Sequence, residues 1–184
     1  TGFVIADDYV LTNAHVVAGT DSVALNTVVG VKRADVVFYD PDVDIAVLRS
    51  ERLGIDPLAW HEDTLGNGDD AIVMGYPLSG PFEAAPARIR GRLNISGPDI
   101  YAQGRVQREA YTIRGVIRQG NSGGPLLTPE GEVIGMIFGA SLDSTDTGYA
   151  LTAHQVQERV GEISRLVDPV DTQACVGVVT GQAA

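Results

Sequence analysis

The sequence predicts an all-β protein with two antiparallel β-barrels. Short segments of β-type composition follow one another along the chain, and turn residues separate them at intervals typical of sandwiches and barrels. With 184 residues, 44% of them hydrophobic, the chain can form one large all-β domain or two small cores that share an interface. Because only one segment has the pattern of a helix, the number of β-type segments favours two barrels.

The expected strands fall into two groups. In the first half they are 2–5, 9–12, 22–25, 34–39, 45–48 and 71–76. In the second half they are 86–95, 110–116, 125–127, 133–138 and 148–151. The stretch 76–86 is rich in Gly and Pro and is the best candidate for the connection between the halves. We therefore expect one unit made of an N-terminal barrel over 1–80 and a C-terminal barrel over 81–184.

Local patterns define some elements in more detail. Ala87, Ile89 and Leu93 alternate with arginines, which predicts a strand with one buried face. Pro129 and Gly131 predict a tight hairpin between the strands on either side of them, which should pair.

The one expected helix lies in the C-terminal part of the chain. Thr152 and Gln155 form a possible capping box at its start. The apolar residues that then recur on one helical face are Val156, Val160, Ile163 and Val167. This face should pack against a barrel.

Charge and hydropathy exclude some functions. Thirteen basic and 24 acidic residues give a formal net charge of −11, so nucleic acid is not an expected partner. The longest apolar stretch is 133–140, far shorter than the ~20 residues that span a bilayer. We expect a soluble domain with no membrane segment of its own.

The two ends of the chain suggest a piece of a longer protein. The chain begins at Thr1 rather than at a methionine and runs directly into an expected strand. The single cysteine, Cys175, lies near the other end. It is either an ordinary small side chain or one half of a disulfide with a cysteine upstream of Thr1.

Three segments carry the residues of a nucleophilic serine site. His15 lies in Thr-Asn-Ala-His-Val-Val, Asp44 directly precedes Ile-Ala-Val-Leu, and Ser122 lies in Gly-Asn-Ser-Gly-Gly-Pro. A serine hydroxyl needs a base to remove its proton, and a carboxylate fixes the tautomer of that base. Asp40 and Asp42 crowd the same turn as Asp44, but Asp44 abuts the apolar run and should be buried beside the histidine, with Asp42 as the alternative.

The glycines around the serine predict an oxyanion hole. They allow a backbone path on which successive amides point at one spot, so the amides of Gly120 and Ser122 are the expected donors. The motif Gly120-x-Ser122-x-Gly124 also matches the nucleophile elbow of α/β-hydrolases, with Asp143 or Asp146 and then His154 as formal partners. An elbow needs a helix after the serine, whereas this sequence predicts a turn into a strand.

On these segments the chain resembles the chymotrypsin-like serine peptidases. The residues around His15 and Ser122 are similar to those of the HtrA branch. Segments 86–90, 96–101 and 111–114, with Cys175, are similar to the MarP-type proteases, which are membrane-anchored periplasmic proteases of mycobacteria. The resemblance covers nearly the whole chain.

The resemblance implies a fold and an arrangement of the site. It implies two antiparallel six-stranded barrels, the first lacking one or more strands in this chain, with His15 and Asp44 on the first and Ser122 on the second. It also implies membrane helices before the protease domain, and a disulfide from Cys175 to a segment outside the chain. Digestive relatives have an aspartate before the nucleophile for activation, but this chain has Asn121.

The resemblance also suggests which residues bind substrate. Val116 and Ile117 take the positions at the bottom of the primary specificity pocket, where no carboxylate is available for Lys or Arg. The strand with Phe138, Gly139 and Ala140 would line that pocket and pair with an extended peptide. We expect an apolar or small residue at the cleavage position.

The expected function is peptide hydrolysis through an acyl-enzyme. His15 accepts the proton of Ser122, and Asp44 stabilises the imidazolium. The substrate is a polypeptide, and neither a metal nor a cofactor is expected, because three scattered histidines and one cysteine offer no ligand spacing. The alternative is an inactive homologue that binds peptides in the same groove. A sequence pI near 4.5 suggests work in an acid-exposed cell envelope.

Overall fold

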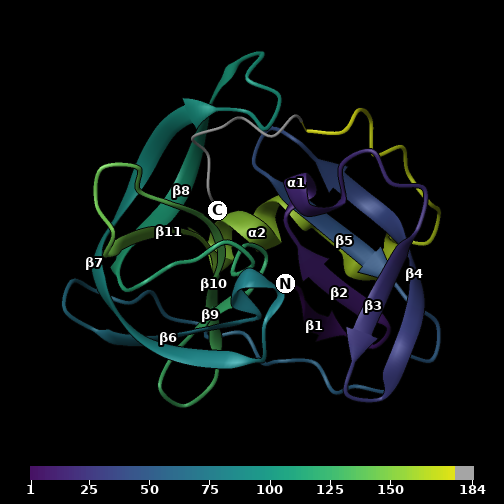
Figure 1. Ribbon diagram of the computed structural model, residues 1–184, viewed down its shortest axis with the longest axis horizontal. Coiled ribbons are helices and arrows are strands. Elements are labelled where there is room, and N and C mark those ends of the chain that lie inside the picture. The colour runs from purple at the N-terminus through teal and green to yellow at the C-terminus, as the bar shows by residue number, and fades with distance from the viewer. Residues whose placement is uncertain (177–184) are drawn as a thin grey trace.

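The computed structural model describes residues 1–176 and consists of two β-sheets with a short helix near the C-terminus (Figure 1). In the first half the elements are β1 (Phe3–Ala6), β2 (Tyr9–Thr12), α1 (Ala14–Val17), β3 (Val23–Thr27), β4 (Gly30–Asp40) and β5 (Ile45–Arg49). In the second half they are β6 (Asp70–Gly75), η1 (Pro77–Ser79), β7 (Glu83–Pro98), β8 (Arg105–Arg114), β9 (Pro125–Leu127), β10 (Val133–Ala140), β11 (Thr147–Thr152), α2 (Ala153–Val160) and η2 (Ile163–Arg165). The predicted all-β fold is confirmed.

The first sheet has five strands in the order β1-β2-β5-β4-β3, all antiparallel. Within the described residues this sheet is open and has five strands, where the first barrel was expected to lack one or more of its six strands in this chain. A β-bulge between Val36 and Phe38 bends β4, as bulges do when they insert an extra residue into one strand. The bend lets one long strand pair with β5 at one end and with β3 at the other.

The second sheet is a closed barrel with the order β10-β11-β8-β7-β6-β9. β6 pairs with β7 and β9, so the chain passes from the first sheet to the barrel between β5 and β6. The change of sheet therefore precedes the expected boundary at residue 80. The end of the expected second domain, 177–184, lies outside the described residues.

The pair β7–β8 is longer than the sequence indicated and extends toward the first sheet (Figure 1). The Ile100 amide in its loop donates to the Pro41 carbonyl at 3.2 Å. A bulge between Ile89 and Gly91 shifts the side-chain alternation by one residue. Leu93, which the sequence placed on the buried face, is for this reason 45% exposed.

Helix α2 begins where the sequence predicted. The Thr152 side chain accepts a hydrogen bond from the Gln155 amide, which satisfies a free donor of the first turn. Gly161, at φ 66°, ends the helix, so Ile163 and Val167 do not continue its apolar face. The remaining face packs on β8, β10 and β11.

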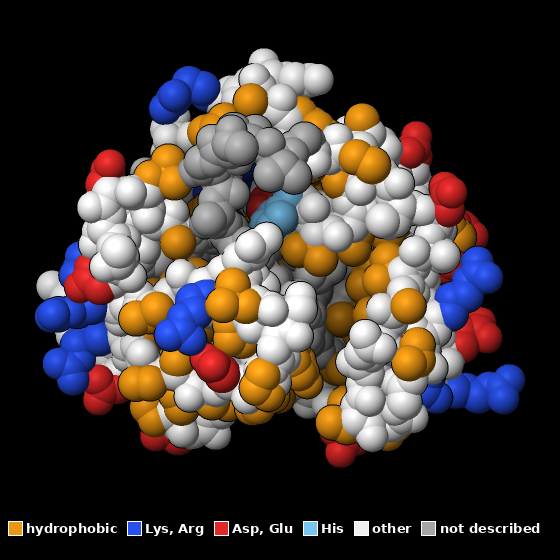
Figure 2. Space-filling model, viewed as in Figure 1, with side chains coloured by type: hydrophobic (Ala, Val, Ile, Leu, Met, Phe, Trp, Pro, Cys, Tyr) orange, Lys and Arg blue, Asp and Glu red, His pale blue; other side chains and the backbone are white. Residues whose placement is uncertain are grey.

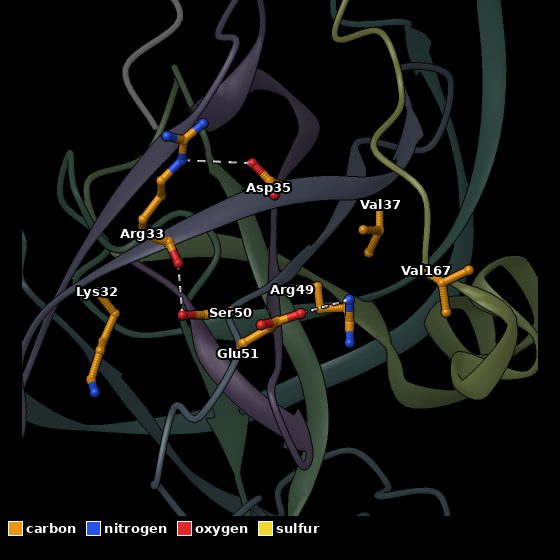
Figure 3. A pocket seen from close by; sticks show the side chains of 8 residues that line it. All are labelled: Lys32, Arg33, Asp35, Val37, Arg49, Ser50, Glu51 and Val167. Carbon is orange, nitrogen blue, oxygen red and sulfur yellow. Dashed lines mark hydrogen bonds and ion pairs between the residues drawn. The ribbon is translucent and has the colours of Figure 1, made fainter.

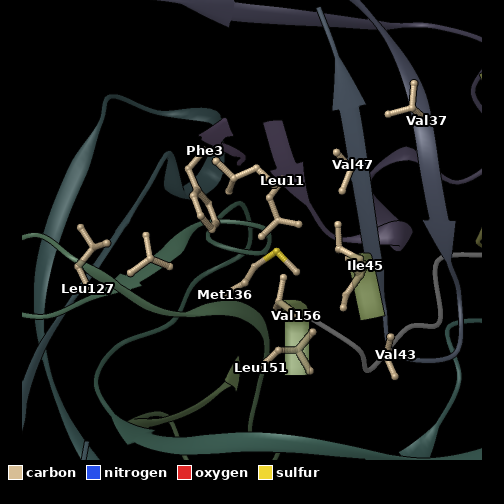
Figure 4. Packing of buried hydrophobic residues seen from close by; sticks show 13 residues of the cluster. Phe3, Leu11, Val37, Val43, Ile45, Val47, Leu127, Met136, Leu151 and Val156 are labelled. Atoms are coloured by element: carbon tan, nitrogen blue, oxygen red, sulfur yellow. The ribbon is translucent and has the colours of Figure 1, made fainter. Parts of the chain in front are cut away.

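One apolar cluster joins the two sheets. Figure 4 shows that Phe3, Leu11 and Ile45 from the first sheet lie around the Met136 side chain of the barrel. The cluster also includes Val156 of α2, and Met136 and Ile45 are fully buried. Each half buries part of its apolar surface against the other, so the relative position of the sheets is fixed by packing.

The surface carries mixed charges (Figure 2). Acidic and basic side chains alternate around the edge of the face shown, and a histidine is visible in its upper part. Within residues 1–176, no helix has both the length and the apolar character needed to cross a bilayer.

Candidate active site

His15 and Asp44 form a hydrogen-bonded pair on the first sheet. His15 is on α1, the single turn after β2, and Asp44 ends the turn between β4 and β5. His15 Nδ1 lies 2.7 Å from Asp44 Oδ2, and the His15 amide donates to Asp44 Oδ1 at 2.9 Å. Asp44 is 4% exposed. A buried carboxylate that bonds Nδ1 in this way fixes the ring orientation and leaves Nε2 free for chemistry.

The backbone of Asp44 is held in an unusual conformation. Its φ of 68° lies in the left-handed region, which Asp tolerates better than most residues. The Asp44 amide donates to the Asp40 carbonyl at 3.0 Å, and Asn13 Nδ2 donates to the Asp44 carbonyl at 2.9 Å. Asn13 was not among the expected site residues; its one signal was the position directly before the helix of His15, where it is the N-cap.

Ser122 lies in the turn between β8 and β9, next to β10. The Gly123 amide donates to the Ile137 carbonyl at 2.8 Å, and the Ile137 amide donates to the Gly124 carbonyl at 2.9 Å. These bonds attach the turn to the barrel wall. Ser122 is 3% exposed, and its Oγ makes no hydrogen bond to another described residue. A hydroxyl without a partner is available as a nucleophile, and such bonds often tighten only when substrate is present.

One cavity of about 400 Å³ brings the predicted catalytic groups together. Its wall is formed by Thr1, His15, Val16, Leu78, Ser79, Gln119, Gly120 and Ser122. Its residues come from both halves of the molecule. The base and the nucleophile therefore face the same space.

The peptide before Gly120 is fixed by a neighbouring loop. The Leu78 amide donates to the Gln119 carbonyl at 2.7 Å. Because no peptide bond in the described chain is cis, the Gly120 N–H of that same peptide unit points away from Leu78. The Thr1 hydroxyl donates to the Gly120 carbonyl. Among the described residues neither the Gly120 amide nor the Ser122 amide has a protein acceptor.

The two expected specificity residues, Ile117 and Val116, differ in burial. Ile117 is partly buried and fills the space beside Gly148, where an added Cβ would overlap Ile117 Cγ1. Gly148 is the ladder partner of Ala140. Val116 is 53% exposed and has no comparable contact.

The strand expected to line the groove is β10. Its Phe138 ring packs beside Tyr149, with 6.3 Å between the ring centroids. On one side Gly139 and Ala140 pair with β11. On the other side β9 reaches only as far as Met136, so the edge at Phe138 to Ala140 has no strand partner among residues 1–176.

The remaining candidates do not form a second site. Cys175 is exposed, and no disulfide within the chain is possible because it is the only cysteine. Residues 1–176 contain no group of His, Cys, Asp and Glu that could hold a metal.

Figure 3 shows another hollow, of about 330 Å³, on the first sheet. Its two arginines pair with acidic side chains, as in Arg49 with Glu51 at 3.7 Å, and it contains no histidine beside a nucleophile.

The α/β-hydrolase interpretation is wrong. Ser122 is followed by strand β9 and not by a helix, so no nucleophile elbow is present. Asp146 forms ion pairs with Arg90 and Arg114 at 3.2 and 3.3 Å, and His154 Nδ1 lies 3.5 Å from Glu109 Oε1.

Comparisons with known proteins agree with this geometry. The family model of the trypsin-like peptidase domain matches residues 1–136. The serine protease Rv3671c of Mycobacterium tuberculosis is 46% identical over 177 residues, which cover 96% of this chain and 44% of that protein. A probable periplasmic DegP-like serine endoprotease of Chlamydia pneumoniae is 31% identical over 186 residues, which cover 97% of this chain and 36% of that protein. The chain belongs to the trypsin-like peptidase family.

Within this family the chain is a serine protease domain of the HtrA and MarP type. The crystal structure of the active form of the Mycobacterium tuberculosis Rv3671c protease has a TM-score of 0.92 at 46% identity and covers 96% of this chain and 78% of that one. The inactive form of the same protease has a TM-score of 0.80 at 44% identity and covers 91% and 83%. The chain spans less than half the length of the curated relatives that it matches.

The tight packing of Gly120 makes a testable prediction. Gly120 has a φ of 97°, and a Cβ there would lie 2.5 Å from the Tyr76 carbonyl oxygen. Gly131 has a φ of 94° but open space where a Cβ would lie, so it is a matched control. We expect Gly131→Ala to cost about 1 kcal/mol of unfolding free energy through its backbone conformation. Gly120→Ala should cost more and also abolish reaction with serine-directed probes.

Urea denaturation and probe labelling measure the two effects. Equal behaviour of the two variants in both assays would show that the packing of Gly120 against Tyr76 has no role in the site.

Proposed function

We propose that this chain is the catalytic domain of a serine endopeptidase with His15, Asp44 and Ser122 as its triad. The observation that carries the proposal is the His15–Asp44 pair, in which the carboxylate is buried and the imidazole faces the same cavity as Ser122. The order His, Asp, Ser along the chain is that of the chymotrypsin-like enzymes.

The geometry supports a division of roles. Asp44 accepts from His15 Nδ1 and so favours the tautomer in which Nε2 accepts a proton. His15 then takes the Ser122 proton as the oxygen attacks the peptide carbonyl, and it returns the proton to the leaving amine. Water, deprotonated by the same imidazole, hydrolyses the acyl-enzyme and regenerates the serine.

The oxyanion hole is the second part of the proposal. The Gly120 N–H points away from Leu78, and the Ser122 N–H has no protein acceptor among residues 1–176. Two such donors would stabilise the tetrahedral oxyanion, each by about 3 kcal/mol. The higher similarity to the active form of the mycobacterial protease supports a competent loop.

The active-site serine can be tested directly with a fluorophosphonate probe. We expect labelling of the wild type and none of Ser122→Ala, because the probe forms its bond with an activated serine oxygen. Asp44→Asn should fold but label more slowly by a factor of about 10⁴, since the amide no longer fixes the tautomer. Ser164→Ala, at an exposed position of η2, is the control and should label as the wild type does.

The same experiment decides between the proposal and the alternative, an inactive homologue that binds peptides. A folded wild type that is not labelled, and that does not hydrolyse casein, would favour the binding module.

We also propose that substrate peptides add as a strand to β10 and place an apolar or small side chain near Ile117. The open edge from Phe138 to Ala140 offers backbone groups for such pairing. Val116 and Ile117 supply no charge for a basic side chain. Val116, being exposed, would lie at the rim of this pocket.

Truncation of Ile117 should change the size preference. We expect Ile117→Ala to raise kcat/KM for Leu or Phe relative to Ala at the residue before the cleaved bond, by about 10-fold, because the pocket gains volume. A series of peptides that differ only at this residue measures the ratio. An unchanged ratio would remove Ile117 from the specificity pocket.

The cellular setting is a proposal that rests on the relatives. We propose an extracytoplasmic domain, anchored to the membrane by segments outside this chain, that acts under envelope or acid stress. Cys175 would form a disulfide with a cysteine outside the chain. Fractionation of cells that express the full-length protein tests the anchor: recovery of all the protein in the soluble cytoplasmic fraction would contradict it.

A further inference from the structure

The turn that presents Asp44 is held by the second half of the molecule. Asp40, Pro41 and Asp42 lie two to four residues before Asp44, and each accepts a hydrogen bond from an element beyond residue 80. The contacts are Arg108 Nη2 to the Asp42 carbonyl (2.5 Å), the Ile100 amide to the Pro41 carbonyl (3.2 Å), and Arg159 Nε (2.9 Å) and Nη2 (2.7 Å) to Asp40 Oδ2. The position of the carboxylate on the first sheet therefore depends on contacts with β8, the β7–β8 loop and α2.

Arg108 differs from the other contacts because it is a buried cation. It is 6% exposed, and its guanidinium lies over the Phe138 ring at 5.7 Å from the centroid. Its Nε has no hydrogen-bond partner among the described residues. Arg159, which pairs with Asp40, is less buried: its side chain is 40% exposed. Burial of a charge is costly unless nearby groups compensate for it, so the surroundings of Arg108 need an explanation.

The compensation comes from the acidic turn and from the tip of the hairpin. Burial lowers the pKa of Arg108, and the charges of Asp44, Asp99, Asp40 and Asp42 act in the opposite direction. An arginine keeps its proton under these conditions. Tyr39 lies beside the same turn and is neutral, since burial and its bond to Tyr101 raise its pKa. Asp44 thus has the His15 imidazole on one side and lies within the field of a permanent buried cation.

We propose that Arg108 is a positioning residue for the catalytic acid: from the barrel it fixes the turn that presents Asp44 to His15. It acts through Asp42 and touches neither the substrate nor the reacting atoms. The same side chain covers Phe138, so it also links this turn to the strand proposed to bind substrate. The inference rests on the proposed serine-peptidase function.

Charge and shape can be separated by substitution. Arg108→Met keeps the aliphatic stem and removes the charge and the donor, whereas Arg108→Lys keeps a cation that can still donate to Asp42. Arg92→Met is the matched control: Arg92 is on the neighbouring strand β7 and pairs with Glu109 at 2.9 Å, away from the turn. Each variant is assayed as the whole chain, and kcat is divided by the concentration of sites titrated with a fluorophosphonate.

We expect Arg108→Met to lower kcat per titrated site at least 10-fold, with a smaller change in KM. Arg108→Lys should recover part of the loss, and Arg92→Met should stay within twofold of the wild type. Dividing kcat by the concentration of titrated sites removes the effect of unfolded protein. The remaining loss of kcat then reports how well the catalytic groups are aligned in the folded molecules.

The pH profile tests the electrostatic part. A fixed cation near Asp44 competes with an imidazolium for the same carboxylate, so its removal should favour a protonated, inactive His15. The acid limb of kcat/KM should then move to higher pH in Arg108→Met and stay close to that of the wild type in Arg108→Lys. The other charged groups at the turn, Asp40 with Arg159, Asp42 and Asp99, are unchanged in both variants.

Several outcomes would overturn the proposal. An unchanged kcat in Arg108→Met, or a loss of kcat with no shift of the acid limb, would show that Arg108 only stabilises the fold. If Arg108→Met does not fold, Arg108→Lys decides by its kcat and acid limb: a loss of kcat of less than 10-fold but greater than that of the Arg92→Met control, with an unshifted limb, would support the proposal, and a kcat equal to that of the control would contradict it. A wild type that neither labels nor hydrolyses peptide would instead refute the proposed function.

Discussion

The structure depends on one constraint: the proposed base and its carboxylate are on one sheet, and the serine is on the other. Proton transfer requires heavy atoms within about 3 Å, so small movements between the halves would separate the groups. The interface is built to resist such movement. Met136 of the barrel is enclosed by side chains from the first sheet, and the long β7–β8 pair contacts the turn before Asp44.

The turn that carries Ser122 must also be fixed in position, and its backbone contacts do this. Gly120 packs so closely on Tyr76 that no side chain fits, and the Leu78 amide fixes the peptide plane that carries the Gly120 N–H. Leu78 and Ser79 both have positive φ, at 55° and 57°, and each such residue costs on the order of 1 kcal/mol or more. Strain of this kind persists only where surrounding contacts determine it. The loop with Leu78 and Ser79 is therefore locally strained, and in this conformation it fixes the direction of the Gly120 amide.

Local chemistry explains what the sequence could predict. Turn residues and alternation located the strands, the hairpin pairing of Leu127 with Val133 is confirmed, and the Thr152 cap is where the pattern indicated. The choice of Asp44 over its neighbours followed from burial next to an apolar run, and it is the carboxylate that contacts His15. These features depend on residues close together in the chain.

Features set by long-range contacts could not be predicted in this way. The bulge before Gly91 reverses the faces of β7, so Leu93 points outward although its local pattern indicated burial. The placement of β6 in the barrel depends on pairing with β7 and β9, and Asn13 gains its role only from the position of the Asp44 carbonyl. The first barrel was expected to lack one or more of its six strands in this chain, and five are present; which strands form the open edges was set by long-range pairing.

The buried guanidinium of Arg108 shows how stability and position can oppose each other. Apolar side chains of similar volume often replace buried ions with a gain in stability. An apolar residue would pack on Phe138 but would give no hydrogen bond to Asp42, whose carbonyl would then lack its donor. Packing alone is also poorly directional, whereas the planar guanidinium defines both distance and angle. A turn that must hold a carboxylate against one edge of an imidazole benefits from such a directional contact, even where a better-packed interface would be more stable.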